Sequence, residues 1–300
     1  MAYFFSIQAG SGNSVIRPAL FKWRPRMIRM KTLLRAVGAL AGVGLAGLAT
    51  AHAASPALPP NIAKSGTLRI CSAVNLPPME FMNAATRPTG LDIDLGDAIA
   101  KRLGVKTDWI NMPFAGLIPA LLASHCDIIM SQLFIKPGRL KVIDEIPYMV
   151  SHEAVLVKPG AKPVPSLENL SGKKVATVTG TTATVLLNAA NAKLHAAGKP
   201  PIDIVMFPEN TQALQQLQFG QVAAYGVAYE TARYYIHKAP GQFAMGGPPY
   251  YTIATGIGIR KNEAVLNKAI GSTLAGMMKD GSYAALFRKW SLGIDMLKPG

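Results

Sequence analysis

The sequence predicts an α/β fold of two lobes, each a mostly parallel sheet flanked by helices, on three observations. Short apolar runs alternate with helical patterns along the chain. This alternation restarts after Val157, and the glycine- and proline-rich stretch 246–249 follows the restarted unit. We therefore predict that residues 54–156 and 251–300 form lobe 1, and that residues 157–250 form lobe 2. Lobe 2 is inserted into lobe 1, and the two crossing segments act as a hinge.

Each element follows from a local pattern. In lobe 1 we predict strands at residues 67–71, 106–110, 127–130 and 256–260, and helices at residues 97–103, 117–122, 263–279 and 283–290. Gly104 ends the first helix as a left-handed C-cap would. The stretch 75–80 should be a loop, because Pro77 and Pro78 have no N–H to donate to a sheet. In lobe 2 we predict strands at residues 173–178, 202–207 and 222–227, and helices at residues 181–194, 211–219 and 230–237.

The first 53 residues have the pattern of a leader. A short basic start at Met30 precedes an apolar run at residues 36–49 and a small-x-small cleavage pattern that ends at Ala53. This indicates a signal peptide at about residues 30–53, cut before Ala54, and hence export from the cytoplasm, which for the family resemblance given below means the periplasm. The upstream stretch fits this pattern poorly, and we interpret it as a gene-model extension. N-terminal sequencing of the unprocessed protein tests that interpretation, which residues from before Met27 would contradict.

The composition excludes several classes of protein. Half of the residues are hydrophobic and 16% are charged, which excludes a disordered chain. The two cysteines and the histidines lie in no metal-binding spacing, so we predict no metal site and no cofactor. Whether Cys71 and Cys126 pair is left open. The net charge is +15, but Lys and Arg are not clustered with interleaved aromatic residues, so we predict no nucleic-acid partner.

Candidate binding residues lie in loops that follow predicted strands, where open parallel sheets bind ligands. Residues 179–182 (Thr-Gly-Thr-Thr) open a helix, and the free N–H groups there attract a carboxylate or phosphate. An ordinary N-cap is the alternative. Arg139 can hold a carboxylate in a two-bond fork, or be a solvated surface residue. Phe114 forms either a wall of the cleft or part of the core.

The order of these motifs resembles that of the family 3 solute-binding proteins of ABC importers, the periplasmic polar amino-acid binders. The resemblance spans about residues 64–292 and rests on colinear motifs: Pro-Pro-Met-Glu ending at Glu80, Gly90-Leu-Asp-Ile-Asp-Leu95, Pro113-Phe-Ala-Gly-Leu-Ile-Pro119, Asp127-Ile-Ile-Met-Ser131, Arg139 and the Thr-Gly-Thr-Thr run. It implies a two-lobed type II periplasmic-binding fold that closes on its ligand and delivers it to an inner-membrane ABC permease. The resemblance also implies that Arg139 grips the ligand α-carboxylate, that Gly180, Thr181 and Thr182 donate to it, and that Phe114 stacks on the ligand.

The chain departs from the family at the site for the ligand ammonium. Ala228 and Tyr229 stand where the family has an aspartate, and Glu230 comes one or two residues late. Either Glu230 shifts into the site, or the ligand lacks an α-amino group. Gln132 would then add a hydrogen bond to the ligand. An apolar ligand body would fit a wall of four candidate residues: Leu76, Met79, Phe114 and Phe134.

We predict a monomeric binding protein without catalytic residues, which captures a small amino acid or related carboxylate. The alternative is a periplasmic enzyme of the same fold, similar to cyclohexadienyl or arogenate dehydratase. Such an enzyme needs a general acid in the cleft, for which Glu153 and Glu230 are the candidates.

Overall fold

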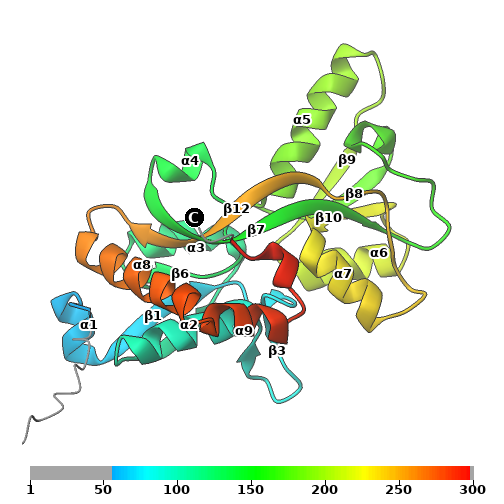
Figure 1. Ribbon diagram of the computed structural model, residues 1–300. Helices are drawn as coiled ribbons and strands as arrows, with labels where there is room; N and C mark the ends of the chain where they lie inside the picture. The colour runs from blue at the N-terminus through cyan, green and yellow to red at the C-terminus, as the bar shows by residue number, and fades with distance from the viewer. Residues whose placement is uncertain (1–55, 298–300) are drawn as a thin grey trace, which may run out of the picture. The chain divides into compact units, whose positions relative to one another are not determined.

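The computed structural model describes residues 56–297 (Figure 1). The predicted signal peptide and the stretch upstream of it lie outside the described residues. Between residues 56 and 297, no helix is both long enough and apolar enough to cross a membrane.

Nine strands of the described chain form one sheet, in the order β5-β1-β6-β12-β7-β10-β8-β9, with β11 also paired to β7. These strands are β1 (Thr67–Ser72), β5 (Lys106–Asn111), β6 (Ile128–Ile129), β7 (Ile143–Val157), β8 (Lys174–Val178), β9 (Asp203–Phe207), β10 (Ala224–Ala228), β11 (Ala244–Met245) and β12 (Tyr250–Arg260). Strands β5, β1 and β6 are parallel, as are β10, β8 and β9. This arrangement agrees with the predicted α/β class.

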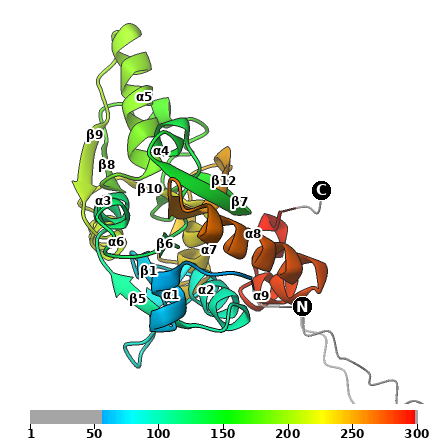
Figure 2. The ribbon, with the colours of Figure 1, turned by 90° about the vertical axis from the view of Figure 1, so that its left-hand side faces the viewer.

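Helices occupy most of the predicted positions. They are α1 (Pro60–Ser65), α2 (Leu91–Arg102), α3 (Leu117–Leu122), α4 (Pro137–Leu140), α5 (Thr182–Ala196), α6 (Asn210–Gln218), α7 (Tyr229–Lys238), α8 (Ala264–Lys279) and α9 (Ser282–Lys289). Helices α2, α8 and α9 lie side by side and share a buried apolar core with β1 (Figures 1 and 2). Short 3-10 turns occur at Phe114–Gly116, Leu167–Leu170 and Gly293–Asp295.

Two local predictions need correction. The stretch 75–80 leaves the main sheet, as expected, but contributes to a separate small sheet of β2 (Asn75–Leu76), β3 (Glu80–Met82) and β4 (Pro88–Thr89). Helix α2 begins six residues before the predicted start. It begins there because Gly90, at φ +134°, packs against the Met79 carbonyl, which then accepts the Asp92 N–H at 2.9 Å.

The long strands β7 and β12 are antiparallel neighbours that connect the two groups of parallel strands. Strand β12 pairs with β6 on one side, and β7 pairs with β10 on the other. The predicted lobe boundaries fall where β7 ends and β12 begins. The division into lobes that move about this pair of strands stays a prediction.

Cys71 and Cys126, whose pairing the sequence left open, form a disulfide with their Cα atoms 5.7 Å apart. Both residues are fully buried, and the bond closes a loop with a sequence separation of 55. Replacing both with serine should lower the free energy of unfolding by about 2–4 kcal/mol, because a long loop regains its freedom in the unfolded chain. Urea unfolding with and without dithiothreitol measures this loss. A parent protein insensitive to the reductant would contradict the prediction.

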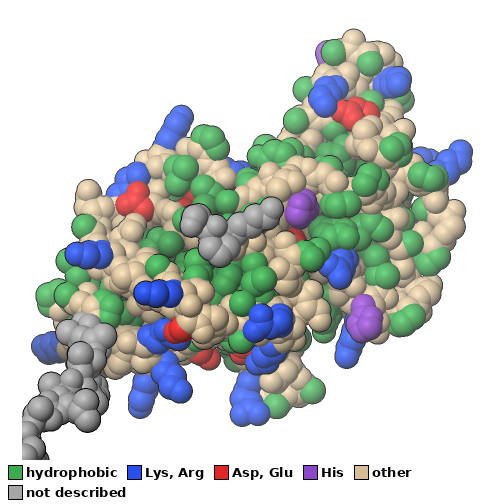
Figure 3. Space-filling model, in the orientation of Figure 1, with side chains coloured by type: hydrophobic (Ala, Val, Ile, Leu, Met, Phe, Trp, Pro, Cys, Tyr) green, Lys and Arg blue, Asp and Glu red, His purple; other side chains and the backbone are tan. Residues whose placement is uncertain are grey.

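The basic side chains are dispersed on the face that Figure 3 shows. Lys and Arg are spread over several elements and do not merge into one patch there.

Candidate ligand-binding site

A small cavity of about 40 Å³ lies where loops from both groups of parallel strands meet. Its walls are formed by Leu76, Phe114, Gln132, Phe134, Arg139, Glu153, Val178, Thr181, Thr182, Ala183, Asn210, Gly226, Val227 and Ala228. The structure thus brings together seven of the ten residues that the sequence singled out. They come from four loops that are far apart along the chain.

Arg139 reaches the cavity from α4 with 8% of its surface exposed. Its Nη1 donates to the Phe134 carbonyl at 2.7 Å, and its Nη2 donates to the Gly180 carbonyl at 3.3 Å. The guanidinium carbon lies 5.4 Å from the centre of the Phe114 ring, within cation–π range. The two donated bonds and the ring fix a buried positive charge at the cavity wall.

Glu145 lies near that charge. Neither of its carboxylate oxygens has a hydrogen-bond partner in the described chain. Burial raises the pKa of Glu145 to about 7, and the positive charge of Arg139 opposes this rise. Arg139 therefore has a neighbouring carboxyl group that is only partly ionised at neutral pH.

The first turn of α5 faces the same cavity. Gly180 has φ +82°, a left-handed conformation that glycine adopts without strain. Thr181 donates its hydroxyl to the Val178 carbonyl at 2.7 Å, and no side chain of residues 56–297 caps the helix. The Thr182 hydroxyl is buried, and it too lacks a partner there. The helix start therefore presents free donors and the positive end of its dipole to the cavity.

Gln132 is held in the cavity wall by polar contacts. Its backbone has φ +41°, an uncommon conformation for this residue, and its N–H donates to the buried Asp92 carboxylate at 2.8 Å. Its Nε2 donates to Ser151 at 3.2 Å and to Glu230 at 2.9 Å. Its Oε1 has no partner within the described residues and is free to accept a hydrogen bond from a ligand.

Glu153 lines the cavity, although the sequence predicts it only as a candidate general acid. It lies on β7 and is 3% exposed. Burial and then repulsion from Glu230 raise its pKa to about 8. The charge of Lys136 and the backbone N–H of Ala183 oppose that rise. One carboxylate oxygen, Oε2, has no hydrogen-bond partner in the part of the chain that the structure describes.

Three predicted residues do not line the cavity. Met79 is fully buried in the core around α2, because its segment turns inward where α2 begins. Gly180 contributes only its carbonyl, which Arg139 binds. Glu230 opens α7 and accepts hydrogen bonds from Gln132 and from the backbone N–H of His152. The structure therefore does not support the hypothesis that Glu230 shifts into the site.

Contacts close the cavity on two sides. Asn210 donates to the Asn75 side chain at 2.7 Å, and Asn75 donates to Glu209. On the other side, Arg139 donates to the Gly180 carbonyl. A cavity of about 40 Å³ holds only a few water molecules. A larger ligand therefore requires these contacts to part.

Comparison with known proteins places the chain among solute-binding proteins. The profile of the family described as bacterial extracellular solute-binding proteins, family 3, matches residues 68–293. The lysine/arginine/ornithine-binding periplasmic protein of Escherichia coli (strain K12) is 29% identical over 82% of this chain and 93% of its own length.

Two solved structures are similar as well. An ancestral arginine-binding protein bound to arginine is 33% identical, with a TM-score of 0.70 over 75% of this chain and 98% of its own. An ancestral amino acid-binding protein, described as a precursor of cyclohexadienyl dehydratase, is also 33% identical, with a TM-score of 0.70 over 77% and 97%.

Proposed function

Because the chain belongs to the bacterial extracellular solute-binding proteins, family 3, we propose that its cavity binds a small amino acid by its α-carboxylate. The family resemblance drawn from the motifs is confirmed, and so is the type II periplasmic-binding fold. The chain is a binding protein of an ABC importer, and its relatives are periplasmic. The relatives are binding proteins rather than enzymes, which favours this function over the dehydratase alternative.

One observation carries the proposal: three residues that line the cavity together with Arg139 each have a buried polar atom without a partner. Among the described residues, Thr182 Oγ1, Gln132 Oε1 and Glu153 Oε2 are buried and have no hydrogen-bond partner. Each such atom costs about 1–3 kcal/mol when it stays unsatisfied. A ligand that carries both a carboxylate and an ammonium group satisfies all of them, which a purely apolar ligand does not.

The cavity offers a place for each part of an amino acid. Arg139 and the first turn of α5 receive the carboxylate, as the resemblance implies. We assign the ammonium to Glu153, since Ala228 replaces the family aspartate and Glu230 lies elsewhere. The side chain of the ligand would lie against a partly apolar wall of Leu76, Phe114 and Phe134.

An amine-free carboxylate is the second candidate. It is favoured by Ala228 in place of the aspartate and by Glu153, whose pKa of about 8 leaves it mostly protonated at neutral pH. A neutral Glu153 can donate its proton to a ligand oxygen, where an ionised one would repel a carboxylate.

Calorimetry separates the two candidates. We expect one or more of arginine, lysine, ornithine, histidine and cystine to bind tightly to protein that has been unfolded and refolded to remove co-purified ligand. The matched acids that lack the α-amino group should bind at least 100-fold more weakly, because the Glu153 partner is lost. Tight binding of an amine-free acid would instead establish the second candidate, and binding of neither class would contradict both. No prephenate turnover is expected.

We propose cleavage between Ala53 and Ala54, binding as a monomer, and delivery to an inner-membrane ABC permease after closure about β7 and β12. The mass of the periplasmic protein and its size in light scattering test the first two. A mature chain that begins upstream of Met30 would contradict the proposed leader.

A further inference from the structure

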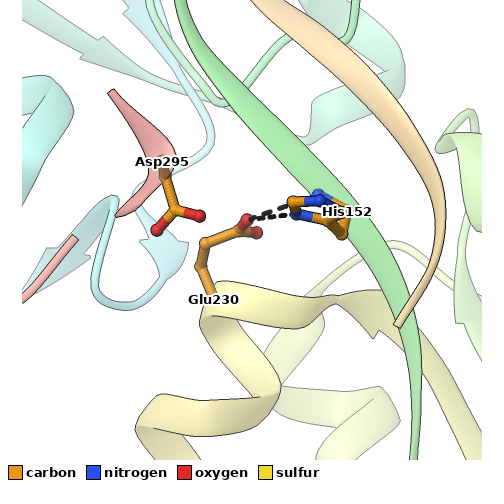
Figure 4. Close-up of side chains that lie close together, drawn as sticks. All are labelled: His152, Glu230 and Asp295. Atoms are coloured by element: carbon orange, nitrogen blue, oxygen red, sulfur yellow. Dashed lines mark hydrogen bonds and ion pairs between the residues drawn. The ribbon is translucent and has the colours of Figure 1, made fainter. Parts of the chain in front are cut away.

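A second cluster of polar side chains lies outside the cavity, where three segments meet (Figure 4). His152 comes from β7, Glu230 from the first turn of α7, and Asp295 from the 3-10 turn Gly293–Asp295. One donor atom from each lies within 4.8 Å of the others, and His152 Nδ1 is 4.0 Å from Glu230 Oε1. Figure 4 shows the Glu230 carboxylate between the imidazole and the Asp295 carboxylate.

Asp295 and His152 leave polar atoms of this cluster without hydrogen-bond partners among the described residues. Asp295 is 1% exposed, and neither of its oxygens has a hydrogen-bond partner within residues 56–297. The same holds for His152 Nδ1. Glu230 is 2% exposed; its Oε2 accepts from Gln132 Nε2, and its Oε1 accepts from the His152 backbone N–H at 3.3 Å. Two buried carboxyl groups thus face each other beside an imidazole nitrogen, although a buried charge normally has a charged partner or a metal ion.

We propose that His152, Glu230 and Asp295 bind a divalent transition-metal ion of the Zn²⁺ class. One imidazole and two carboxylates are suitable ligands for such an ion, and a water molecule can take the fourth position. Metal–ligand distances of about 2.0–2.2 Å place donor atoms roughly 3.3 Å apart. Small side-chain rotations would bring the three donors from their present separation to that geometry.

The cluster lies beside an outer groove. Glu230 lines this groove between α7 and the end of α9, and the His152 side chain is 29% exposed. Since Glu230 also accepts from Gln132, the ion would lie one hydrogen bond from a wall of the ligand cavity.

The test is a metal titration of the tag-free protein after treatment with a chelator. We expect it to bind one equivalent of Zn²⁺ in competition with a chromophoric chelator, and to bind Mg²⁺ far more weakly. Asp295→Asn keeps the shape of the side chain and removes a buried charge, so this variant should fold. It should lower the Zn²⁺ affinity at least tenfold, as should His152→Ala. The matched control is His195→Ala, which removes an exposed histidine from α5 and should change nothing.

Thermal unfolding gives a second readout. Zn²⁺ should raise the Tm of the parent protein and of His195→Ala, because the ion binds the folded state. At the same Zn²⁺ concentration it should raise the Tm of Asp295→Asn by less. The proposal is overturned if the parent shows no saturable Zn²⁺ binding, or if Asp295→Asn binds Zn²⁺ as tightly as the parent. Amino-acid titrations carried out in the presence of a chelator keep the test of ligand binding independent of this one.

Discussion

Replacing Arg139 with methionine should weaken amino-acid binding by roughly 30-fold to several thousandfold, the largest effect expected at the site. Loss of one partner of a buried, hydrogen-bonded charge pair costs about 2–5 kcal/mol, and 1.4 kcal/mol corresponds to a factor of ten in Kd. The ligand carboxylate would keep only the first turn of α5 as its partner. Isothermal titration calorimetry of the variant against the tightest-binding amino acid measures this loss.

Two further variants make the result specific to the guanidinium fork. Arg139→Lys retains the charge but not the two parallel donors, so its affinity should fall between those of the parent and Arg139→Met. Arg102→Met removes an arginine of α2 that pairs with Asp280 at the surface, and should leave the Kd unchanged. Parent-like affinity in a folded Arg139→Met protein would show that the carboxylate binds elsewhere.

The parts of the site that could be predicted from the sequence are those with a local cause. Gly180 opens a helix directly after a strand, and Arg139 follows the apolar run of β6 within one loop, so both positions follow from the rule that ligands bind beyond the carboxyl ends of parallel strands. The same holds for Leu76 and Phe114. In each case the residue and the strand that positions it are close together in the sequence.

The sequence does not place Glu153 at the cavity, because it predicts no strand over residues 143–157. Strand β7 runs from Ile143 to Val157, but its first part contains charged residues and Pro147, which hide the alternating pattern of a strand. Without that strand, nothing indicated which side chains share its face. In the structure, Ser151 and Glu153 lie toward Gln132 and the cavity, whereas His152 faces Glu230 and Asp295.

Long-range assembly explains the other differences. The donors from His152, Glu230 and Asp295 belong to segments that only the fold brings together, so no motif spacing could reveal the cluster. Met79 lies in a loop rich in candidate residues, but the direction of its side chain depends on how the segment turns into α2. Such directions are set by tertiary packing, which the sequence of one loop does not encode.

Glu153→Gln should separate an amino-acid ligand from an amine-free one through pH. In the free protein the pKa of Glu153 is raised to about 8, so the group carries its proton below that pH. An ammonium ligand needs the ionised carboxylate and must displace this proton. Amino-acid affinity should therefore rise by up to tenfold per pH unit toward pH 8 and level off above it. An amine-free acid should show the reverse, with constant affinity below pH 8 and a decline above it.

The variant isolates this contribution from those of its neighbours. Lys136, with its pKa lowered to about 8 by burial, and Glu230, with its pKa raised to about 8 by burial, also titrate in this range. The slope due to Glu153 is therefore the difference between the parent and Glu153→Gln, measured by calorimetry from pH 6 to 9. Glu168→Gln, which removes a surface carboxylate paired with Lys193, is the matched control and should keep the parent profile.

If Glu153→Gln retains both the affinity and the pH profile of the parent, the ligand ammonium does not bind at Glu153. A profile that falls above pH 8 in the parent and flattens in the variant would instead mean that the protonated carboxyl group donates to an amine-free ligand.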